Sequence, residues 1–401
     1  MANTSSVPLG AAPPVVVRPV STRADRKRFV EVAYALNRDL PHWVPPLRKE
    51  VYGLIDPGEN PWFGHAQAQL FVAERGGRPV GRISAQVDRL VLEAPPEQGG
   101  GPGTGHWGMF EAADSEAAAA LIEAAEEWLR GRGMSRAMGP YSLSIWDEPG
   151  LLVSGHDHPP MVMMGHHDPA YETWVEAAGY AKAKDLFTYD LDVSHPFPPL
   201  VRRIVASGER NPRIRLRRVD LSKYDEEAVV ILTILNDAWS HNWGFVPLTD
   251  AEKEYGGSKL KPMIRADLVM IAEYDFTGSG ERFDPAAFMM ALPDVNEFLA
   301  DLGGSLYPFG WVKLLWGLRG MRTKGGRVPL MGVVRRLHGQ RLASQLAFML
   351  IDRIREAGHA GYGITRSEIG WVLEDNEGMK AIAAAIESEV NRVYRIYEKP
   401  I

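Results

Sequence analysis

The chain has 401 residues, of which 45% are hydrophobic and 24% are charged, and its formal net charge is −6 at pH 7. This length and composition allow two ordinary globular cores, and no apolar run approaches the roughly 20 residues that cross a membrane as a helix. The absence of cysteine excludes disulfides, thiolate zinc sites and a thiol nucleophile. The acidic balance argues against a nucleic-acid-binding protein.

The first half of the chain alternates strand-like and helix-like segments. Residues 1–14 read as a loose tail and lack the long apolar stretch of a secretory signal. The domain expected at 15–193 begins with the strand VVVRPV and a helix, continues with a hairpin that turns at Gly76-Gly77, and closes on the strand KAKDLFTYDLDV. This order predicts an α/β domain of the α+β type with a mixed sheet. Residues 194–212 are the expected linker to a second domain.

Two loops of the first half carry polar side chains that suit chemistry. In PYSLSIWDEPGLLVSG, the Glu148 carboxylate is a candidate to hold or deprotonate an amino group, and Tyr141 is a candidate substrate contact; stabilising a turn is the alternative. In MMGHHDPAY, His166 and His167 are of a type that binds metals, but adjacent histidines rarely converge on one ion without further ligands. We therefore expect no metal.

The second half, 213–401, repeats the plan of the first. A strand and a helix precede the strand pair DLVMIAEYD and PAAFMMALPDVNE, and a short helix and a closing alternating segment come last. Two similar orders predict tandem domains, each with a central, mostly antiparallel sheet flanked by helices. The loop after the first helix of this half contains His241 and, as candidate substrate contacts, Asn242 and Trp243. A loop histidine with an ordinary pKa near 6.5 is a candidate base, and a surface histidine without a chemical role is the alternative.

The segment from Val328 to Gly358 reads as a strand, a tight turn and a long amphipathic helix. Such a turn leaves backbone N–H groups of the first helical turn unpaired, and together with the helix dipole they suit a pyrophosphate. Between Asp301 and Asp352 the sequence holds eight basic and no acidic side chains, so the surroundings favour an anion. The segment predicts a phosphate-bearing cofactor, with an ordinary strand-to-helix connection as the alternative.

Residues 303–326 combine aromatic and aliphatic side chains with only basic charges. A segment of this composition can lie at a membrane interface or line a channel for a long acyl chain. A helix packed on the sheet, with its charges in water, is the third possibility. Trp311 and Trp316 are the candidate substrate contacts in this segment.

The order of elements around the turn resembles the GNAT superfamily, the acyl-coenzyme A-dependent N-acyltransferases. In that family an Arg/Gln-x-x-Gly-x-Gly/Ala signature holds the coenzyme A pyrophosphate; Arg336 and Gly339 match it, and Arg341 stands where Gly or Ala is usual. The resemblance implies acyl-coenzyme A as co-substrate, bound by the second domain. The residues that it assigns to cofactor binding are Val333, Val334, Arg336, His338, Gly339, Gln340, Arg341 and Asn376.

Other features of the superfamily are only partly present. At the position of the signature the first half has residues 111–114, EAAD, which are a poor host for phosphate. GNAT proteins often have an Asn where Asn376 stands and, about two helical turns later, a Tyr that protonates the departing thiolate, but the helix after Asn376 has no Tyr. Tyr394 on the final strand is a candidate for that role, with packing in the sheet as the alternative. The simplest reaction is direct attack on the thioester by an amine that His241 or Glu148 deprotonates.

Phrases along almost the whole chain, among them HWVPPLRKEV, MGPYSLSIWDEPGLLVSG and YRIYEKP, resemble a bacterial branch of the superfamily that includes ceramide synthases. This resemblance implies transfer of a fatty acyl group from long-chain acyl-coenzyme A to the lipid-like amine of a sphingoid base or its 3-keto precursor. The absence of cysteine suits a cytoplasmic protein, peripheral on the inner face of the inner membrane if 303–326 contacts lipid. Transfer to amino acids or small amines, aminoacyl transfer from tRNA, and non-catalytic sensing of acyl-coenzyme A are the alternatives.

Overall fold

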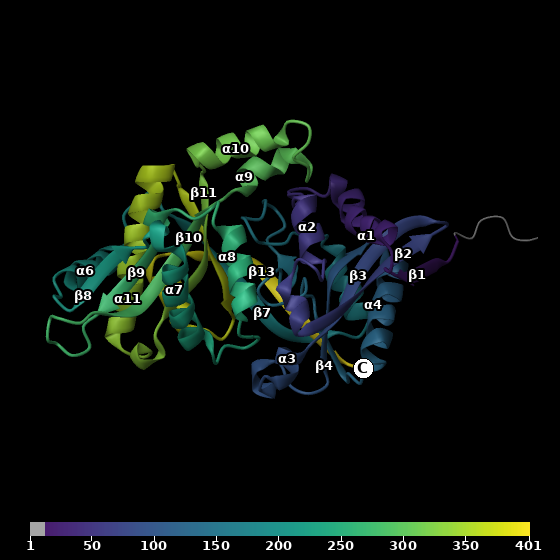
Figure 1. The fold of residues 1–401 in the computed structure, drawn as a ribbon, viewed down its shortest axis with the longest axis horizontal. Helices are drawn as coiled ribbons and strands as arrows, with labels where there is room; N and C mark the ends of the chain where they lie inside the picture. The colour runs from purple at the N-terminus through teal and green to yellow at the C-terminus, as the bar shows by residue number, and fades with distance from the viewer. Residues whose placement is uncertain (1–12) are drawn as a thin grey trace, which may run out of the picture.

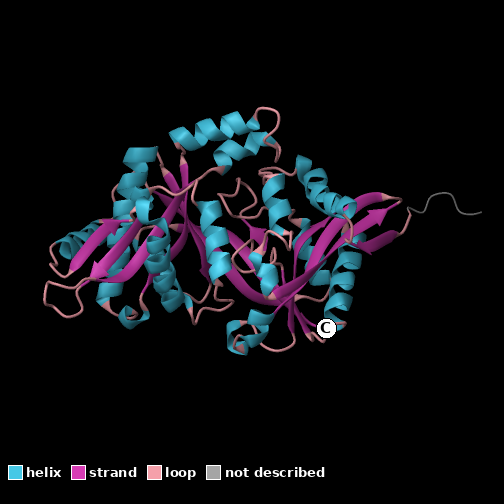
Figure 2. Ribbon diagram, viewed as in Figure 1, coloured by secondary structure: helices cyan, strands magenta, loops and turns pink. Residues whose placement is uncertain are grey.

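The computed structural model describes residues 13–401, through which one long, twisted sheet runs (Figures 1 and 2). The first half of the chain contributes β1 (Val15–Pro19), β2 (Ala66–Arg75), β3 (Arg78–Asp88), β4 (Thr104–Ala112), β5 (Arg136–Gly139), β6 (Leu151–Ser154) and β7 (Ala181–Asp192). The second half contributes β8 (Ile214–Arg218), β9 (Val269–Tyr274), β10 (Asp284–Pro293), β11 (Gly325–Val333), β12 (Arg366–Leu373) and β13 (Glu389–Pro400).

Helices flank the sheet along its length (Figure 2). The helices of the first half are α1 (Arg23–Leu36), α2 (Arg48–Leu54), α3 (Arg89–Glu93), α4 (Ser115–Arg130) and α5 (Ala170–Ala177). After them come α6 (Pro199–Glu209), α7 (Tyr224–Trp239), α8 (Asp250–Leu260), α9 (Asn296–Leu299), α10 (Gly310–Gly320), α11 (Arg341–Ala357) and α12 (Glu377–Ala385). The expected α/β class with a mixed sheet is confirmed. The expected tail lies, apart from Pro13 and Pro14, outside the described residues.

Both halves arrange their strands in the same order. β1 to β4 are antiparallel neighbours, and β4 then pairs with β5 in parallel. In the second half β8 to β11 are antiparallel neighbours, and β11 then pairs with β12 in parallel. The parallel pair of each half is joined by one long helix, α4 or α11, as a parallel connection requires.

The last strand of each half is exchanged with the other half. β7 comes from the first half but pairs with β12, and β13 comes from the second half but pairs with β5. Because β7 and β13 also pair with each other, the order across the middle of the sheet is β5-β13-β7-β12. Figure 1 shows the result, since the C terminus lies among the elements of the first half. The two halves therefore share one sheet.

Local sequence explains where the main helices begin and which face they bury. α1 and α8 each start at a threonine whose side chain and the acidic residue three positions later cap the first turn, Thr22 with Asp25 and Thr249 with Glu252. α11 buries an apolar face against β9, β10 and α6. Residues 194–212 contain α6, and a Cβ added at Gly208 would lie 2.2 Å from Met349 Sδ of α11, so the segment between the halves holds a closely packed helix.

Candidate active site

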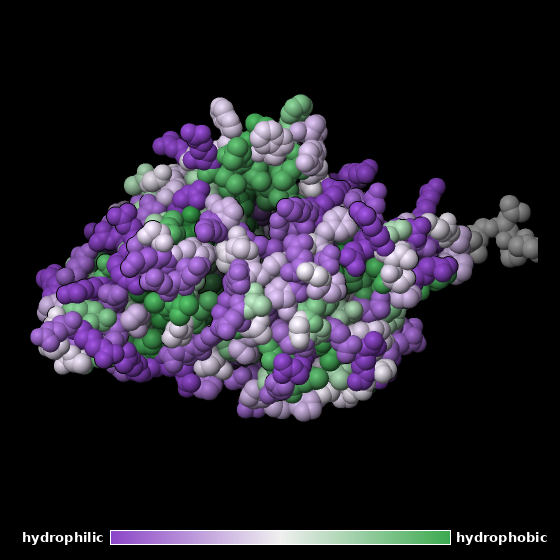
Figure 3. Space-filling model, in the orientation of Figure 1, coloured by the Kyte–Doolittle hydropathy of each residue, from purple (hydrophilic) through white to green (hydrophobic). Residues whose placement is uncertain are grey.

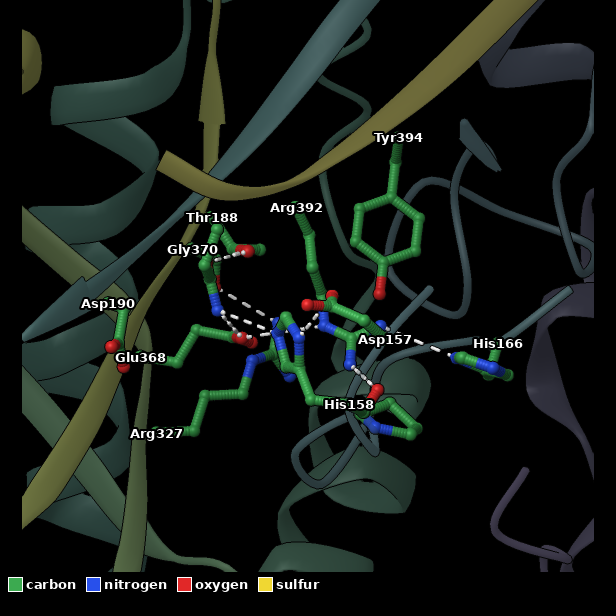
Figure 4. A network of polar contacts seen from close by, with 12 residues as sticks. Asp157, His158, His166, Thr188, Asp190, Arg327, Glu368, Gly370, Arg392 and Tyr394 are labelled. Carbon is green, nitrogen blue, oxygen red and sulfur yellow. Dashed lines mark hydrogen bonds and ion pairs between the residues drawn. The ribbon is translucent and has the colours of Figure 1, made fainter. Parts of the chain in front are cut away.

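β11 and β12 separate near the middle of the sheet, and this opening is the centre of the candidate site. On β11 the parallel pairing covers residues 325–328. Arg327 lies at the point where the strands part and is buried. Its guanidinium donates to the Gly370 carbonyl of β12 at 3.0 Å and to the Val162 carbonyl, in a loop of the first half, at 2.8 Å (Figure 4). This one side chain thus connects both strands of the opening to the other half of the protein.

A cavity of about 1080 Å³ extends from the opening into the space between the two halves. Pro329, Leu330 and Trp371 line it beside the opening, and apolar residues of α7 and α8 continue the wall. The first half supplies residues of α1 and α2 and of the loops around 144–148 and 160–167, while α9 and α10 close the top. Its volume is at the upper end of the roughly 300–1,000 Å³ typical of small-molecule sites, so it suits a large, mainly apolar substrate.

The end of the cavity formed by the first half carries carboxylates. The Glu148 side chain is exposed and lines the cavity, so its exposed surface faces the interior of the cavity. Burial raises the pKa of the Glu148 carboxyl, Arg82 opposes this shift, and the negative charge of Glu111 adds to it. Burial also raises the pKa of Asp147 to about 7, although its carboxylate accepts a hydrogen bond from Ser144 Oγ at 2.8 Å. Carboxyl groups whose pKa is raised suit proton transfer better than ordinary carboxylates do.

In the first half, acidic side chains occupy the turn that corresponds to the one before α11. Glu111, near the end of β4, is buried and accepts hydrogen bonds from Asn37 Nδ2 and the Tyr171 hydroxyl, both at 2.9 Å. Asp114 then caps α4 and pairs with Arg75 at 2.5 Å, so its carboxylate already occupies the N-terminus of this helix. A carboxylate at this helix N-terminus competes with any phosphate there, and the expectation that this turn is a poor host for phosphate stays a prediction.

Beside the cavity, a buried network of charges joins the two halves (Figure 4). Arg392 of β13 is fully buried, and its Nε lies 3.8 Å from the Glu368 carboxylate of β12. Its guanidinium also donates to the His158 carbonyl and lies 3.5 Å from His166 Nδ1. Asn391 donates to Glu368 at 2.9 Å. Because a buried charge without its partner is strongly unfavourable, this network holds the exchanged strand β13 against β12 and the loop at His158, next to the cavity.

The turn before α11 is open in the way that a phosphate site requires. Gly339 has a φ of +75°, and a Cβ at this position would meet no atom within 4 Å. The Gln340 side chain donates to the Arg336 carbonyl at 2.7 Å and does not cap the helix. Within residues 13–401 the backbone N–H of Arg341 has no hydrogen-bond partner. The Arg336 guanidinium lies over the ring of Phe276, 3.1 Å from its centroid.

The other residues expected at the cofactor site lie around the turn or across the opening. The Val334 N–H donates to the Ala286 carbonyl at 2.8 Å, and His338 Nε2 lies 2.7 Å from the Val333 carbonyl. Asn376 lies beyond the end of β12, where its side chain caps α12. Seven of these residues thus run from the last residue of β11 through the turn to the first residue of α11, and Asn376 lies past the end of β12, at the start of α12.

Only one of the three candidates for catalysis reaches the cavity. Glu148 lines it, whereas His241 is exposed and is not part of its wall. Tyr394 is buried in β13, and its hydroxyl donates to the Gly165 carbonyl at 2.9 Å. Burial raises the pKa of the Tyr394 hydroxyl, which keeps it protonated. Of these three side chains, the one in a position to meet an acceptor in the cavity is Glu148.

The candidates for substrate contact do not come together either. Tyr141 is buried and stacks on His106, with 4.4 Å between the ring centroids. Asn242 and Trp243 lie in the loop after α7 without lining the cavity, and the Trp243 ring lies beneath Lys184. Trp311 and Trp316 of α10 are 51% and 79% exposed and face away from the cavity.

Sequence reasoning missed the aromatic wall of the cavity and the position of one arginine. Trp146 and Trp239 are parallel, with centroids 5.9 Å apart, and Trp239 also lies 5.9 Å from Trp371. Trp239 Nε1 donates to the Met331 carbonyl at 3.1 Å, on the open stretch of β11. The three tryptophans come from distant segments, so no local pattern predicts that they meet. Arg327 is one of the eight basic residues between Asp301 and Asp352 that favour an anion near the turn, but the structure buries it.

Within residues 13–401, no group of three or more His, Cys, Asp or Glu side chains is arranged to hold a metal ion. Over the same residues, no helix is both long and apolar enough to cross a membrane.

Comparison with known proteins identifies the family. No protein-family model matches the chain. The chain is 44% identical over 387 residues to the bacterial ceramide synthase of Caulobacter vibrioides, covering 96% of this chain and 97% of that protein. The chain belongs to the bacterial ceramide synthase family. Another relative of this ceramide synthase family member is the protein YghO of Escherichia coli, which is 38% identical over 391 residues, covering 96% and 95% of the two chains.

Solved structures confirm the expected GNAT fold for this ceramide synthase family member. A tandem GNAT protein from the clavulanic acid biosynthesis pathway aligns with a TM-score of 0.55 and 14% identity, covering 96% of this chain and 98% of the other. A GCN5-related N-acetyltransferase from Sphaerobacter thermophilus aligns with a TM-score of 0.51 and 13% identity, covering 96% and 95%. The protein is an acyltransferase, as its family and fold together indicate.

Proposed function

We propose that this enzyme transfers a fatty acyl group from a long-chain acyl-coenzyme A to the primary amine of a sphingoid base, or of its 3-keto precursor. The cavity is the main support, because its 1080 Å³ connect the opening between β11 and β12 with the carboxylates of the first half. The 44% identity to a bacterial ceramide synthase supports the same class of acceptor. An acetyl group and an amino acid would leave most of such a cavity empty.

We assign acyl-coenzyme A to the second half of the protein. Its diphosphate would lie at the turn before α11, where free N–H groups, the helix dipole, Arg336 and Arg341 all favour negative charge. The lack of a side chain at Gly339 leaves room for it. From this turn the cofactor would follow Val333 and Val334 into the opening between β11 and β12, so that its thioester reaches the cavity.

We assign the acceptor to the part of the cavity between the halves. Its ammonium group would lie beside the Glu148 carboxylate, and its hydrocarbon chain and the acyl chain would lie against the apolar walls. Those walls include Ile231, Leu232 and Leu235 of α7 and Leu260 of α8. Burial of each methylene contributes about 0.8 kcal/mol, so affinity for both substrates should rise steeply with chain length.

The reaction then needs one base and a thioester within reach. Glu148 takes a proton from the ammonium group, and the free amine attacks the carbonyl carbon of the thioester. The new N–C bond forms, the C–S bond breaks, and the coenzyme A thiolate leaves and gains a proton. We prefer Glu148 to His241 because Glu148 lines the cavity, and we prefer it to Tyr394 because the Tyr394 hydroxyl is buried and donates to a backbone carbonyl.

A cytoplasmic location is part of the proposal, since acyl-coenzyme A is present there. Residues 303–326 would give the enzyme peripheral contact with the inner face of the inner membrane.

The test is an acyl-transfer assay with a panel of substrates. Palmitoyl- and acetyl-coenzyme A are each offered with sphinganine, with 3-ketosphinganine and with a mixture of amino acids, while free thiol release and the masses of the products are recorded. We expect thiol release and an N-acyl lipid with palmitoyl-coenzyme A and a sphingoid base. Glu148→Gln should lower kcat about 10²- to 10⁴-fold, whereas Glu123→Gln, on the exposed side of α4, should not. Products from amino acids alone would refute the proposed acceptor.

A further inference from the structure

The helix α10 is apolar on two opposite faces, which is unusual for a helix at a protein surface. Leu314 and Leu318 face inward and line the cavity, and a Cβ added at Gly317 would meet the Phe298 ring at 2.7 Å. On the other side Leu315 and Trp316 point outward. A helix with apolar side chains on opposite faces is normally buried on both of them, but the protein covers only the inner face of α10.

The outer face of the segment 303–322, here called the roof segment, gathers large apolar side chains at the surface (Figure 3). The exposed fractions are 86% for Tyr307, 75% for Phe309, 51% for Trp311, 57% for Leu315 and 79% for Trp316. These five make up nearly half of the exposed large hydrophobic side chains among residues 13–401. Isolated apolar residues at a surface are ordinary, but a cluster of this kind marks an interaction site.

The charges next to this cluster are basic. Lys313 pairs with Asp301 at 2.6 Å, but Arg319 and Arg322, at the end of α10, form no ion pair with any residue among 13–401. Lys324 follows and likewise has no ion pair within the described part of the chain. Exposed aromatic and aliphatic groups flanked by free arginine and lysine side chains match the interface of a bilayer that contains anionic lipid.

The roof segment also lies over the cavity and spans the two halves (Figure 1). Its start is fastened to the first half, where Arg48 donates from Nη1 to the Gly303 carbonyl at 2.6 Å and from its backbone N–H to the Gly304 carbonyl at 3.0 Å. Its ends have backbone conformations with positive φ, 55° at Gly303 and 42° at Met321. The helix α10 therefore separates the interior of the cavity from whatever covers the outer face of the roof segment.

We propose that the roof segment docks on the surface of an anionic phospholipid bilayer and admits the lipid acceptor into the cavity from the membrane, beneath α10. This inference deepens the proposed function, from which it takes the lipid acceptor and the membrane contact, and it adds the docking face and the route by which the acceptor enters. A lipid amine that moves from the bilayer into the cavity beneath Leu314 and Leu318 keeps its hydrocarbon chain out of water throughout.

The docking test is sedimentation of the full-length protein with phosphatidylcholine vesicles, with and without phosphatidylglycerol. We expect binding to the anionic vesicles that weakens as salt is added. Replacing three outer side chains together, Tyr307→Ser, Phe309→Ser and Leu315→Ser, should reduce binding at least about ten-fold. The matched control is Leu200→Ser with Val229→Ser, two side chains that are 60% and 64% exposed elsewhere on the surface. The control should bind like the unaltered protein.

The depth of insertion can be read from one fluorescent label, because the chain has no cysteine. An environment-sensitive dye on Leu315→Cys should brighten when anionic vesicles are added, and the same dye on Val229→Cys should not. Equal vesicle binding by the triple variant and the unaltered protein would overturn the docking. So would a dimer of the unaltered protein that the triple variant loses, since a second copy of the chain would then cover this face.

The route of the acceptor is tested with two kinds of substrate. Acyl transfer to sphinganine embedded in anionic vesicles should slow at least about ten-fold in the triple variant, while transfer to a short-chain, water-soluble amine stays unchanged. Equal slowing with both substrates would contradict entry from the membrane. Vesicle binding without any transfer to lipid amines would refute the proposed function and leave the docking intact. Transfer in detergent by a protein that binds no vesicles would refute the docking alone.

Discussion

Asp294, at the end of β10, provides a test of how pH acts on the contact between the two halves. Its Oδ1 accepts a hydrogen bond from the backbone N–H of Val162, in the loop of the first half, at 2.9 Å. Asn296, two residues later, donates to the Pro160 carbonyl of the same loop at 2.9 Å. Burial, reinforced by the charges of Glu297 and Glu368, raises the pKa of Asp294 from 3.8 to about 7.

The direction of the Asp294 pKa shift determines how the stability of the folded protein changes with pH. Between pH 3.8 and about 7 the unfolded chain has released this proton and the folded protein still holds it, so the folded protein loses stability as pH rises through this window. A shift of about 3 units at 1.36 kcal/mol per unit gives a ceiling of about 4 kcal/mol above pH 7. Asp294→Asn keeps the Oδ1 acceptor and carries no charge. We therefore expect the variant to be more stable than the unaltered protein at pH 8 by about 2–4 kcal/mol.

The assay is urea-induced unfolding of both proteins at several pH values from 4 to 8, followed by circular dichroism. The difference in unfolding free energy should grow from pH 4 to 7 and then stay constant, and contributions from Asp147 cancel in this difference. Asp250→Asn is the control, because that carboxylate is exposed and Lys253 lowers its pKa; it should bring no gain at pH 8. Parallel pH curves for Asp294→Asn and the unaltered protein would refute the reasoning.

Three further outcomes follow from the site. Gly339→Trp should abolish binding of acyl-coenzyme A in a calorimetric titration while the protein stays folded. The control, Gly280→Trp, at a glycine with a similar φ of +78° and open surroundings, should bind normally. Unchanged affinity in Gly339→Trp would count against the phosphate turn. Arg392→Met should lower the free energy of unfolding by roughly 3–5 kcal/mol in denaturant titrations, because it leaves Glu368 buried without its partner; a neutral effect would show that the network contributes little. The value of kcat/KM for the amine should rise with pH as Glu148, whose pKa burial raises, loses its proton and can act as the base. The same pH profile in Glu148→Gln would instead assign this rise to another group.

Local patterns in the sequence were enough to predict the main elements and the tight turn between β11 and α11. The turn residues Arg336 and Gly339 are three positions apart in the chain, and their geometry depends on a strand, a glycine and a helix that follow one another. The hairpin at Gly76-Gly77 connects β2 and β3 as its turn chemistry predicts. Glu148 could be singled out because two acidic residues follow one another in a loop.

The rest of the site depends on contacts between distant segments. Arg327 looks like part of a basic surface when it is read with its neighbours, but pairing of β11 with β12 and contact with the loop at Val162 bury it. His241 looks suitable in sequence because it lies in a loop, and only the tertiary arrangement shows that its side chain is exposed and lies outside the cavity wall. The path of β13 into the first half has no local signal at all, since strand pairing across hundreds of residues is not encoded in periodicity.

The position of β13 has a consequence for synthesis on the ribosome. Tyr397 pairs with Gly139, so β5 has an unpaired edge until nearly the last residues of the chain have been translated. β7 remains equally incomplete, because both of its neighbours, β12 and β13, are made after it. The nascent first half therefore emerges with three strand edges open to wrong partners, one on β5 and two on β7, and either half expressed by itself should be prone to aggregation.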